Sequence, residues 1–113
     1  LIDPSARMAR DIVLGNNVII MKNVSIGIFV EIGDNVIVYP NASIDHDCKI
    51  ASHSHICPGV ILAGNVKINE AVFLGIGSVI SNKIEIGKNA IIGAGAVVVR
   101  NVEADAVYKG FRN

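Results

Sequence analysis

Residues 18–38, VIIMKNVSIGIFVEIGDNVIV, repeat one pattern every six positions. Each repeat has an aliphatic residue, a small or β-branched residue two positions earlier, and a turn-forming residue just before that. The aliphatic series runs along almost the whole chain and has seventeen members, too many to arise by chance. They are Ile2, Met8, Leu14, Ile20, Ile26, Ile32, Val38, Ile44, Ile50, Ile56, Leu62, Ile68, Leu74, Ile80, Ile86, Ile92 and Val98.

The other two positions of the repeat are similarly regular. The small or β-branched series is Ala6, Ile12, Val18, Val24, Val30, Val36, Ala42, Cys48, Ser54, Val60, Val66, Val72, Ser78, Ile84, Ala90, Ala96 and Val102. Asn, Asp and Gly, which tolerate a positive φ, dominate the turn-forming series. Its members are Ser5, Asp11, Asn17, Asn23, Phe29, Asn35, Asn41, Asp47, His53, Gly59, Asn65, Ala71, Gly77, Lys83, Asn89, Gly95 and Asn101. Each hexad therefore predicts a short strand with two inward residues, followed by a corner.

A period of six does not fit a helix, and it is shorter than the spacing of a hairpin meander. It resembles the left-handed parallel β-helix, in which three hexads form one triangular coil of eighteen residues. The hexads predict an all-β domain of nearly six coils over residues 1–102, without loop insertions. At ~4.8 Å per coil the prism is roughly 25–30 Å tall. Residues 103–113 lose the pattern, and we expect them to cap the last coil.

The composition excludes several classes of protein. Ten basic and ten acidic residues give a formal charge of zero, so nucleic acid and anionic membranes are not the expected partners. No apolar run approaches the ~18–20 residues of a membrane span. We expect no signal peptide, because residues 1–4 already follow the structural pattern. Two cysteines without a metal-binding or redox motif predict a cytoplasmic protein with reduced thiols.

The chemically capable residues gather around residues 43–67, which contain all three histidines and both cysteines. His46 lies between Asp45 and Asp47. An imidazole that titrates near neutral pH can remove a proton from an attacking amine or hydroxyl, and a neighbouring carboxylate orients it and raises its basicity. Gly64, eighteen residues further on, stacks above His46 and leaves a notch. A solvated surface histidine beside two turn aspartates is the alternative interpretation.

A second corner carries a column of glycines. Gly59, Gly77 and Gly95 are eighteen residues apart and stack above Asn41. Such a bare corner can receive an extended ligand along the prism axis, although a glycine in a turn is also ordinary turn chemistry.

His46 and His55 are nine residues apart, which is half a coil. They are therefore expected on different sides of one prism, where they cannot act together. In a threefold trimer, His46 of one chain can approach His55 of the next. This arrangement predicts a composite site between subunits, with three sites in each trimer.

Two other kinds of chemistry are less well supported. Three histidines within ten residues suggest zinc, which three histidines bind in the β-helix of the gamma-class carbonic anhydrases. However, His53 and His55 are too close together to span a coil, so we expect no metal. Cys48 belongs to the inward series and Cys57 has no activating partner, so neither is expected to be a nucleophile.

Several segments resemble the NeuD/PglD-type sugar acetyltransferases over nearly the whole chain. They are residues 1–6 (LIDPSA), 44–48 (IDHDC), 55–60 (HICPGV), 62–68 (LAGNVKI) and 92–98 (IGAGAVV). The resemblance implies transfer of an acetyl group from acetyl-CoA to an amino or hydroxyl group of a sugar. His46 matches the general base, and Asp47 matches the acidic neighbour that raises its basicity. The implied acetyl-CoA contacts are His55, Gly64 (beside the acetyl group), Ile76 and Ala94 (through backbone groups on the pantetheine arm).

The chain departs from this family in three ways. The family usually has an N-terminal α/β domain that holds the nucleotide of a UDP-sugar, and this sequence contains none. Tyr39 stands where several relatives have an asparagine near the acceptor, so it is the candidate acceptor contact. Residues 109–112 (KGFR) replace the usual Gly-Asn-Pro ending.

The expected reaction is direct transfer, with His46 as the base and a backbone N–H near Gly64 stabilising the oxyanion. The alternative from another class is a non-catalytic β-helix that serves as a scaffold or assembly module.

Overall fold

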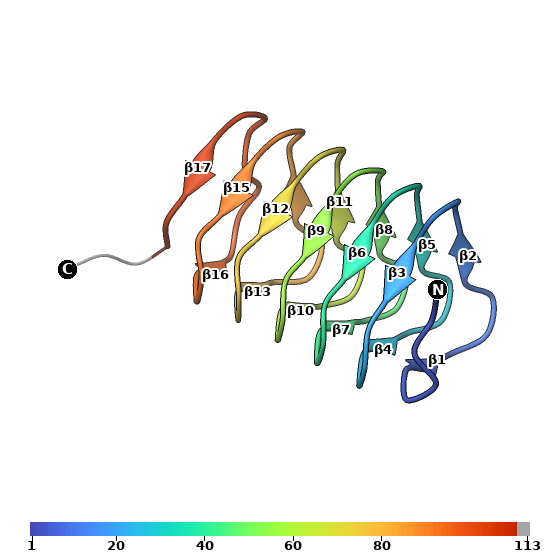
Figure 1. The fold of residues 1–113 in the computed structure, drawn as a ribbon. Coiled ribbons are helices and arrows are strands. Elements are labelled where there is room, and N and C mark those ends of the chain that lie inside the picture. The colour runs from blue at the N-terminus through green and yellow to red at the C-terminus, as the bar shows by residue number, and fades with distance from the viewer. Residues whose placement is uncertain (111–113) are drawn as a thin grey trace.

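The computed structural model describes residues 1–110, and this part of the chain contains seventeen strands of two residues each (Figure 1). They are β1 (Arg7–Met8), β2 (Val13–Leu14), β3 (Ile19–Ile20), β4 (Ser25–Ile26), β5 (Glu31–Ile32), β6 (Ile37–Val38), β7 (Ser43–Ile44), β8 (Lys49–Ile50), β9 (His55–Ile56), β10 (Ile61–Leu62), β11 (Lys67–Ile68), β12 (Phe73–Leu74), β13 (Val79–Ile80), β14 (Glu85–Ile86), β15 (Ile91–Ile92), β16 (Val97–Val98) and β17 (Val107–Tyr108). Residues 1–110 hold no helix with the length and apolarity of a membrane span.

The strands form three parallel sheets, which are the three sides of a prism. Sheet A has the order β17-β15-β12-β9-β6-β3, sheet B has β1-β4-β7-β10-β13-β16, and sheet C has β14-β11-β8-β5-β2. The chain passes through sheets A, B and C in turn, and each strand pairs with the strand one coil away (Figure 1). The predicted left-handed β-helix of hexapeptide repeats is confirmed, and no loop interrupts it within residues 1–110.

The core consists of the two inward series. Every member from Val18 to Val98 is buried. The first coil is packed from one side only, and Ile2 there is 44% exposed. Ser54 is a polar member of the core, and its hydroxyl donates to the carbonyl of Asn69 and accepts the backbone N–H of Val72. The buried Ser54 hydroxyl therefore has both a hydrogen-bond acceptor and a donor.

The corners have left-handed backbone conformations, as the turn-forming series predicts. Fifteen consecutive members of this series, from Asp11 to Gly95, have φ between 56° and 71°. They include Phe29, Ala71 and Lys83, which rarely adopt this conformation. The coil therefore imposes the conformation even where the side chain does not favour it.

The last coil is two residues shorter than the others. Val102 pairs with Ile86, and Val107 pairs with Ile91, so the offset is 16 residues instead of 18. Residues 103–108 consequently continue the coil, and β17 adds a last strand to sheet A. The boundary expected at residue 102 is thus a change of register within the coil, and the capping role of the segment stays a prediction. Residues 111–113 of the expected cap lie outside the described residues.

Candidate active site

His46 lies at a corner between sheets B and C, on the turn that connects β7 to β8. Its carbonyl accepts the N–H of Asn65 in the next coil at 3.0 Å. The following residue, Asp47, has φ 59° and donates its N–H to Ile28 of the preceding coil at 3.0 Å. The backbone under the imidazole is therefore held from both neighbouring coils.

The imidazole of His46 has one carboxylate partner. Its Nδ1 lies 2.9 Å from Oδ2 of Asp47, and both side chains are about half exposed, at 49% and 47%. Asp45 accepts the backbone N–H of His46 at 2.7 Å instead of contacting the ring. Asp47 is thus the residue that orients the imidazole, and Asp45 shapes the turn.

Gly64 makes room for this ring. A Cβ at position 64 would lie 2.6 Å from Nε2 and 2.7 Å from Cε1 of His46, closer than side chains approach one another. The imidazole therefore lies directly over the Gly64 backbone. The Gly64 N–H makes no hydrogen bond to another backbone group within residues 1–110. The predicted notch is present, and the His46 ring fills it.

The second group of expected residues belongs to sheet A and its edge. His55 is on β9, and its Nδ1 lies 3.2 Å from the hydroxyl of Tyr39. The ring centroids of His55 and Tyr39 are 6.0 Å apart at an interplanar angle of 26°. Phe73, directly opposite His55 on β12, has its ring 6.0 Å away at 37°. The imidazole of His55 is thus held between two aromatic rings.

A hollow of ≈ 460 Å³ lies beside this group and is largely apolar. Its lining includes Tyr39, Cys57, Pro58, Phe73, Ile76 and Ala94. Beside it, a Cβ at Gly77 or Gly95 would meet no atom within 4 Å, so this corner is bare as the sequence predicts. Tyr39, Ile76 and Ala94 therefore come together in one groove. Sequence reasoning missed Phe73, although its position eighteen residues after His55 was a usable signal.

The expected site residues consequently form two separate groups in one chain. The corner group is Asp45, His46, Asp47 and Gly64, between sheets B and C. The groove group is Tyr39, His55, Ile76 and Ala94, on sheet A and at its corner with sheet B. These groups occupy different sides of the prism, as the spacing of half a coil predicts.

His53 belongs to neither group. It lies at the corner between sheets C and A, where its Nδ1 is 3.3 Å from Nδ2 of Asn35. Within residues 1–110, no three His, Cys, Asp or Glu side chains come together in a way that holds a metal ion.

The two cysteines are free and buried. Burial raises the pKa of Cys48 to about 11, and its thiol donates to the carbonyl of Ala63 at 3.1 Å. Burial also raises the pKa of the Cys57 thiol. Because a thiolate is the reactive form, both cysteines are poor nucleophiles at neutral pH.

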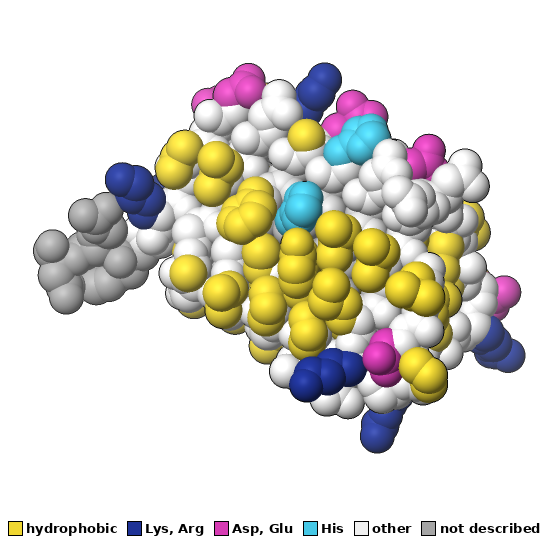
Figure 2. Space-filling view, in the orientation of Figure 1, with side chains coloured by type: hydrophobic (Ala, Val, Ile, Leu, Met, Phe, Trp, Pro, Cys, Tyr) yellow, Lys and Arg dark blue, Asp and Glu magenta, His cyan; other side chains and the backbone are white. Residues whose placement is uncertain are grey.

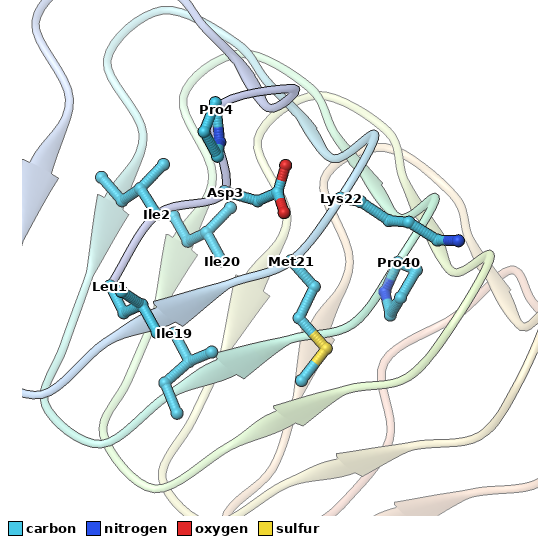
Figure 3. Close-up of a pocket in the computed structure, with 9 residues that line it drawn as sticks. All are labelled: Leu1, Ile2, Asp3, Pro4, Ile19, Ile20, Met21, Lys22 and Pro40. Carbon is cyan, nitrogen blue, oxygen red and sulfur yellow. The ribbon is translucent and has the colours of Figure 1, made fainter.

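A second apolar hollow, of ≈ 480 Å³, lies at the N-terminal end of the prism (Figure 3). It is lined by Leu1, Ile2, Asp3, Pro4, Ile19, Ile20, Met21, Lys22 and Pro40. Met21 and Pro40 lie next to each other on one side of it, with Lys22 at its rim (Figure 3). It contains none of the expected site residues, so we do not assign the chemistry to it.

Comparison with known proteins identifies the family. The family described as "Bacterial transferase hexapeptide (six repeats)" matches residues 11–44, 29–64 and 65–100. These matches cover more than half of the chain, which therefore belongs to the bacterial transferase hexapeptide family. A search of curated protein sequences gives no match.

Two acetyltransferases are among the similar solved structures. One is a variant of GDP-perosamine N-acetyltransferase from Caulobacter crescentus with CoA and GDP-perosamine, with a TM-score of 0.93 and 37% identity over 94% of this chain and 50% of that chain. The other is the acetyltransferase domain of PglB from Neisseria gonorrhoeae with acetyl coenzyme A, with a TM-score of 0.90 and 32% identity over 91% of this chain and 50% of that chain. This chain thus spans about half the length of both.

AntD, an N-acyltransferase from Bacillus cereus, shares the fold at 20% identity and a TM-score of 0.88, over 97% of this chain and 75% of that chain. The family match and the similar structures confirm the resemblance to sugar acetyltransferases that the sequence predicts.

Proposed function

We propose that this chain is the β-helix part of an acetyltransferase, which moves an acetyl group from acetyl-CoA to an amino or hydroxyl group of a nucleotide-linked sugar. The similar proteins that bind CoA and a nucleotide sugar support the donor and the class of acceptor. The observation that carries the proposal is the His46–Asp47 pair, whose 2.9 Å contact leaves Nε2 of His46 as the free ring nitrogen.

The proposed reaction proceeds by direct transfer. The acceptor nitrogen or oxygen attacks the thioester carbonyl carbon, while Nε2 of His46 removes the acceptor's proton. The bond between the carbonyl carbon and sulfur then breaks, and the CoA thiolate leaves. The imidazolium of His46 returns its proton to that thiolate. Asp47 holds Nδ1 throughout, so that Nε2 keeps its lone pair for the next acceptor.

The charge that develops on the carbonyl oxygen needs a hydrogen-bond donor. The Gly64 N–H is our candidate, because Gly64 adjoins the His46 ring and its N–H has no backbone partner within residues 1–110. Donors of this kind contribute about 2.7–4 kcal/mol in other acyl-transfer enzymes.

The proposed assembly is a homotrimer in which the groove group of one chain faces the corner group of the next. Sheet A supports this arrangement because the outward side chains next to His55 are apolar, with Phe73 44%, Ile91 45% and Val107 59% exposed. Figure 2 shows hydrophobic side chains gathered over this face. An exposed apolar surface of this kind is typical of an interaction site. The groove beside Ile76 and Ala94 would then hold the pantetheine arm, with its thioester directed to the neighbouring chain.

The acceptor side is assigned to Tyr39, at the rim of this groove. We place the reaction in the cytoplasm, where reducing conditions keep the free thiols of Cys48 and Cys57 reduced. The acetylated sugar would be a precursor for polysaccharide synthesis.

Two measurements test the proposal. Calorimetric titration with CoA should give saturable binding, and acetyl-CoA with GDP- or UDP-linked amino sugars should release CoA thiol and form an acetylated sugar. Absence of both CoA binding and transfer would favour the scaffold interpretation. Stoichiometric zinc in the purified protein would favour the anhydrase-like alternative.

A further inference from the structure

The two histidines of the proposed site have opposite hydrogen-bond partners at the same ring nitrogen. Nδ1 of His46 faces a carboxylate, and Nδ1 of His55 faces a phenol hydroxyl. We propose that Tyr39 is a positioning residue that fixes His55 as a hydrogen-bond donor through Nε2–H, so that His55 binds the acyl carbonyl oxygen and does not act as a base. The assignment of the acyl carbonyl oxygen as the atom that His55 binds rests on the proposed function. The tautomer of His55 and the positioning role of Tyr39 do not.

The tautomer of His46 follows from its partner. An ionised carboxylate only accepts hydrogen bonds, so the proton of a neutral imidazole must lie on Nδ1, 2.9 Å from Asp47. The hydrogen bond that one ring nitrogen makes determines the state of the other. Nε2 of His46 is therefore left with a lone pair, as a general base requires.

The same reasoning gives His55 the opposite state. A phenol is protonated at neutral pH, and its O–H is a better donor than a neutral imidazole N–H, whereas the imidazole nitrogen is the better acceptor. The pair at 3.2 Å is therefore an O–H···N hydrogen bond from Tyr39 to Nδ1 of His55. Within residues 1–110, the Tyr39 hydroxyl has no other hydrogen-bond partner. The remaining proton of the neutral ring lies on Nε2, which becomes a donor.

The surroundings of His55 hold this arrangement in place. The rings of Tyr39 and Phe73 lie on either side of the imidazole, each with its centroid 6.0 Å away. The residues opposite His55 on the neighbouring strands are Ile37 and Phe73, so no charged side chain occupies the adjacent register positions. A flip of the imidazole would break the bond to Tyr39 between two aromatic rings, where both partners are partly buried.

An Nε2–H in a fixed position can donate a hydrogen bond to one of the reacting groups in an acyl transfer. The carbonyl oxygen of the thioester gains negative charge as the acceptor attacks, and a donor aimed at it lowers the barrier. The attacking amine or hydroxyl needs a group that takes a proton, which an Nε2–H cannot do. His55 is therefore assigned to the acyl oxygen, and Tyr39 acts on the reaction through His55.

The tautomers can be measured without substrate. Two-bond ¹⁵N–¹H spectra of the folded chain, recorded where the imidazoles are neutral, distinguish protonated from unprotonated ring nitrogens. We expect the proton on Nδ1 in His46 and on Nε2 in His55. In Tyr39→Phe, the two nitrogens of His55 should give averaged signals while those of His46 stay unchanged. Phe73→Leu, the control, keeps the phenol and should keep the tautomer.

Kinetics provide a second readout. Gln offers an amide N–H near the position of Nε2 but cannot act as a base, so His55→Gln should retain kcat within about tenfold. Tyr39→Phe should lower kcat about tenfold in the native chain, a fraction of the ~100–1,000-fold effect of deleting an oxyanion donor. This effect on kcat should disappear in the His55→Gln background, because the two residues act on kcat as one unit. Loss of the acceptor contact proposed for Tyr39 would instead appear in the KM for the acceptor.

The proposal is overturned if native His55 carries its proton on Nδ1, or if Tyr39→Phe leaves its spectrum unchanged. It is also overturned if His55→Gln is as inactive as His46→Gln, because His55 would then be needed as a base. A chain with the expected tautomers that transfers no acetyl group would contradict the proposed function and leave the positioning role of Tyr39 intact.

Discussion

The corner of His46 and the face of His55 hold the same side chain by different means. His46 lies on a left-handed turn whose backbone is bonded to the coils on both sides, and its ring covers a glycine. His55 lies on a strand, where two aromatic rings and one hydroxyl hold it. A β-helix can thus position a polar group through its backbone at a corner or through stacked side chains on a face. Predictions that change one group at a time test whether the two groups have separate roles.

The largest effect is expected from removing the base. His46→Ala should lower kcat at least ~100-fold, as deletions of general bases do, while the proposed trimer still forms. Thiol release from acetyl-CoA measures turnover, and size-exclusion chromatography with light scattering measures the assembly. His53→Ala is the matched control, because His53 lies at another corner, where its Nδ1 is 3.3 Å from Nδ2 of Asn35. Near-native turnover of His46→Ala would show that this histidine is not the base.

A mixture of two inactive chains tests whether the site is shared. If each site takes His46 from one chain and His55 from the next, unfolding and refolding His46→Ala together with His55→Ala restores sites that contain both histidines. Random assembly at equal concentrations gives about one quarter of the native sites. Each variant refolded alone is the control. If the mixture regains nothing while trimers form, both histidines of a site come from one chain.

The corner group was largely readable from the sequence. Gly64 above His46 follows from the coil of eighteen residues, and the positive φ of Asp47 follows from the turn series. The repeat does not choose between the two aspartates, because the choice depends on where each side chain points from a left-handed turn. Only the family resemblance indicated Asp47. In the structure Asp47 reaches the ring and Asp45 reaches the backbone N–H.

The groove group and the last coil were harder to predict from the sequence. Tyr39 and His55 are sixteen residues apart, so the eighteen-residue coil does not place them one above the other. They meet because the long side chain of Tyr39 extends to His55. The last coil still has inward residues, but it is two residues shorter before Val102. Its inward residues therefore no longer follow the six-residue period. Strict periodicity therefore predicts the repeats and fails where a side chain reaches across a corner or the period changes.

Asp47→Asn tests the electrostatic part of the corner. An asparagine can donate its amide N–H to Nδ1, which moves the imidazole proton to Nε2 and gives His46 the state that we infer for His55. We expect kcat to fall roughly 10–100-fold with little change in KM, because the wrong tautomer cannot accept a proton. Asp45→Asn is the control, since its Oδ1 still accepts the His46 backbone N–H. Equal losses in both variants would contradict the assignment of Asp47 as the ring's partner.

Gly64→Ala tests the steric part. A Cβ 2.6 Å from Nε2 must push the ring away, and the backbone N–H at position 64 is kept. We expect kcat to fall about tenfold, in line with the cost of a small misplacement of a catalytic group. The melting temperature should fall as well, but not in the His46→Ala background, where no ring opposes the methyl group. If Gly64→Ala lowers the melting temperature equally in both backgrounds, the added methyl group clashes with a group other than the His46 ring.

The buried thiols give the smallest effect and compare the cores behind the two groups. Burial raises the pKa of Cys48 from the ordinary 9.0 to about 11, so the folded protein holds the thiol proton more tightly than the unfolded chain. This contribution to stability is complete below pH 9 and is lost as the pH rises toward 11. The urea concentration at the unfolding midpoint of the native chain should therefore fall between pH 9 and 10.5. In Cys48→Ala this fall should be smaller. Cys57→Ala should reduce the fall of the midpoint less than Cys48→Ala does. The reason is that Cys57 lines the groove and is 6% exposed, whereas Cys48 is fully buried. If both variants reduce the fall of the midpoint equally, the core behind the groove excludes solvent as well as the core behind the corner.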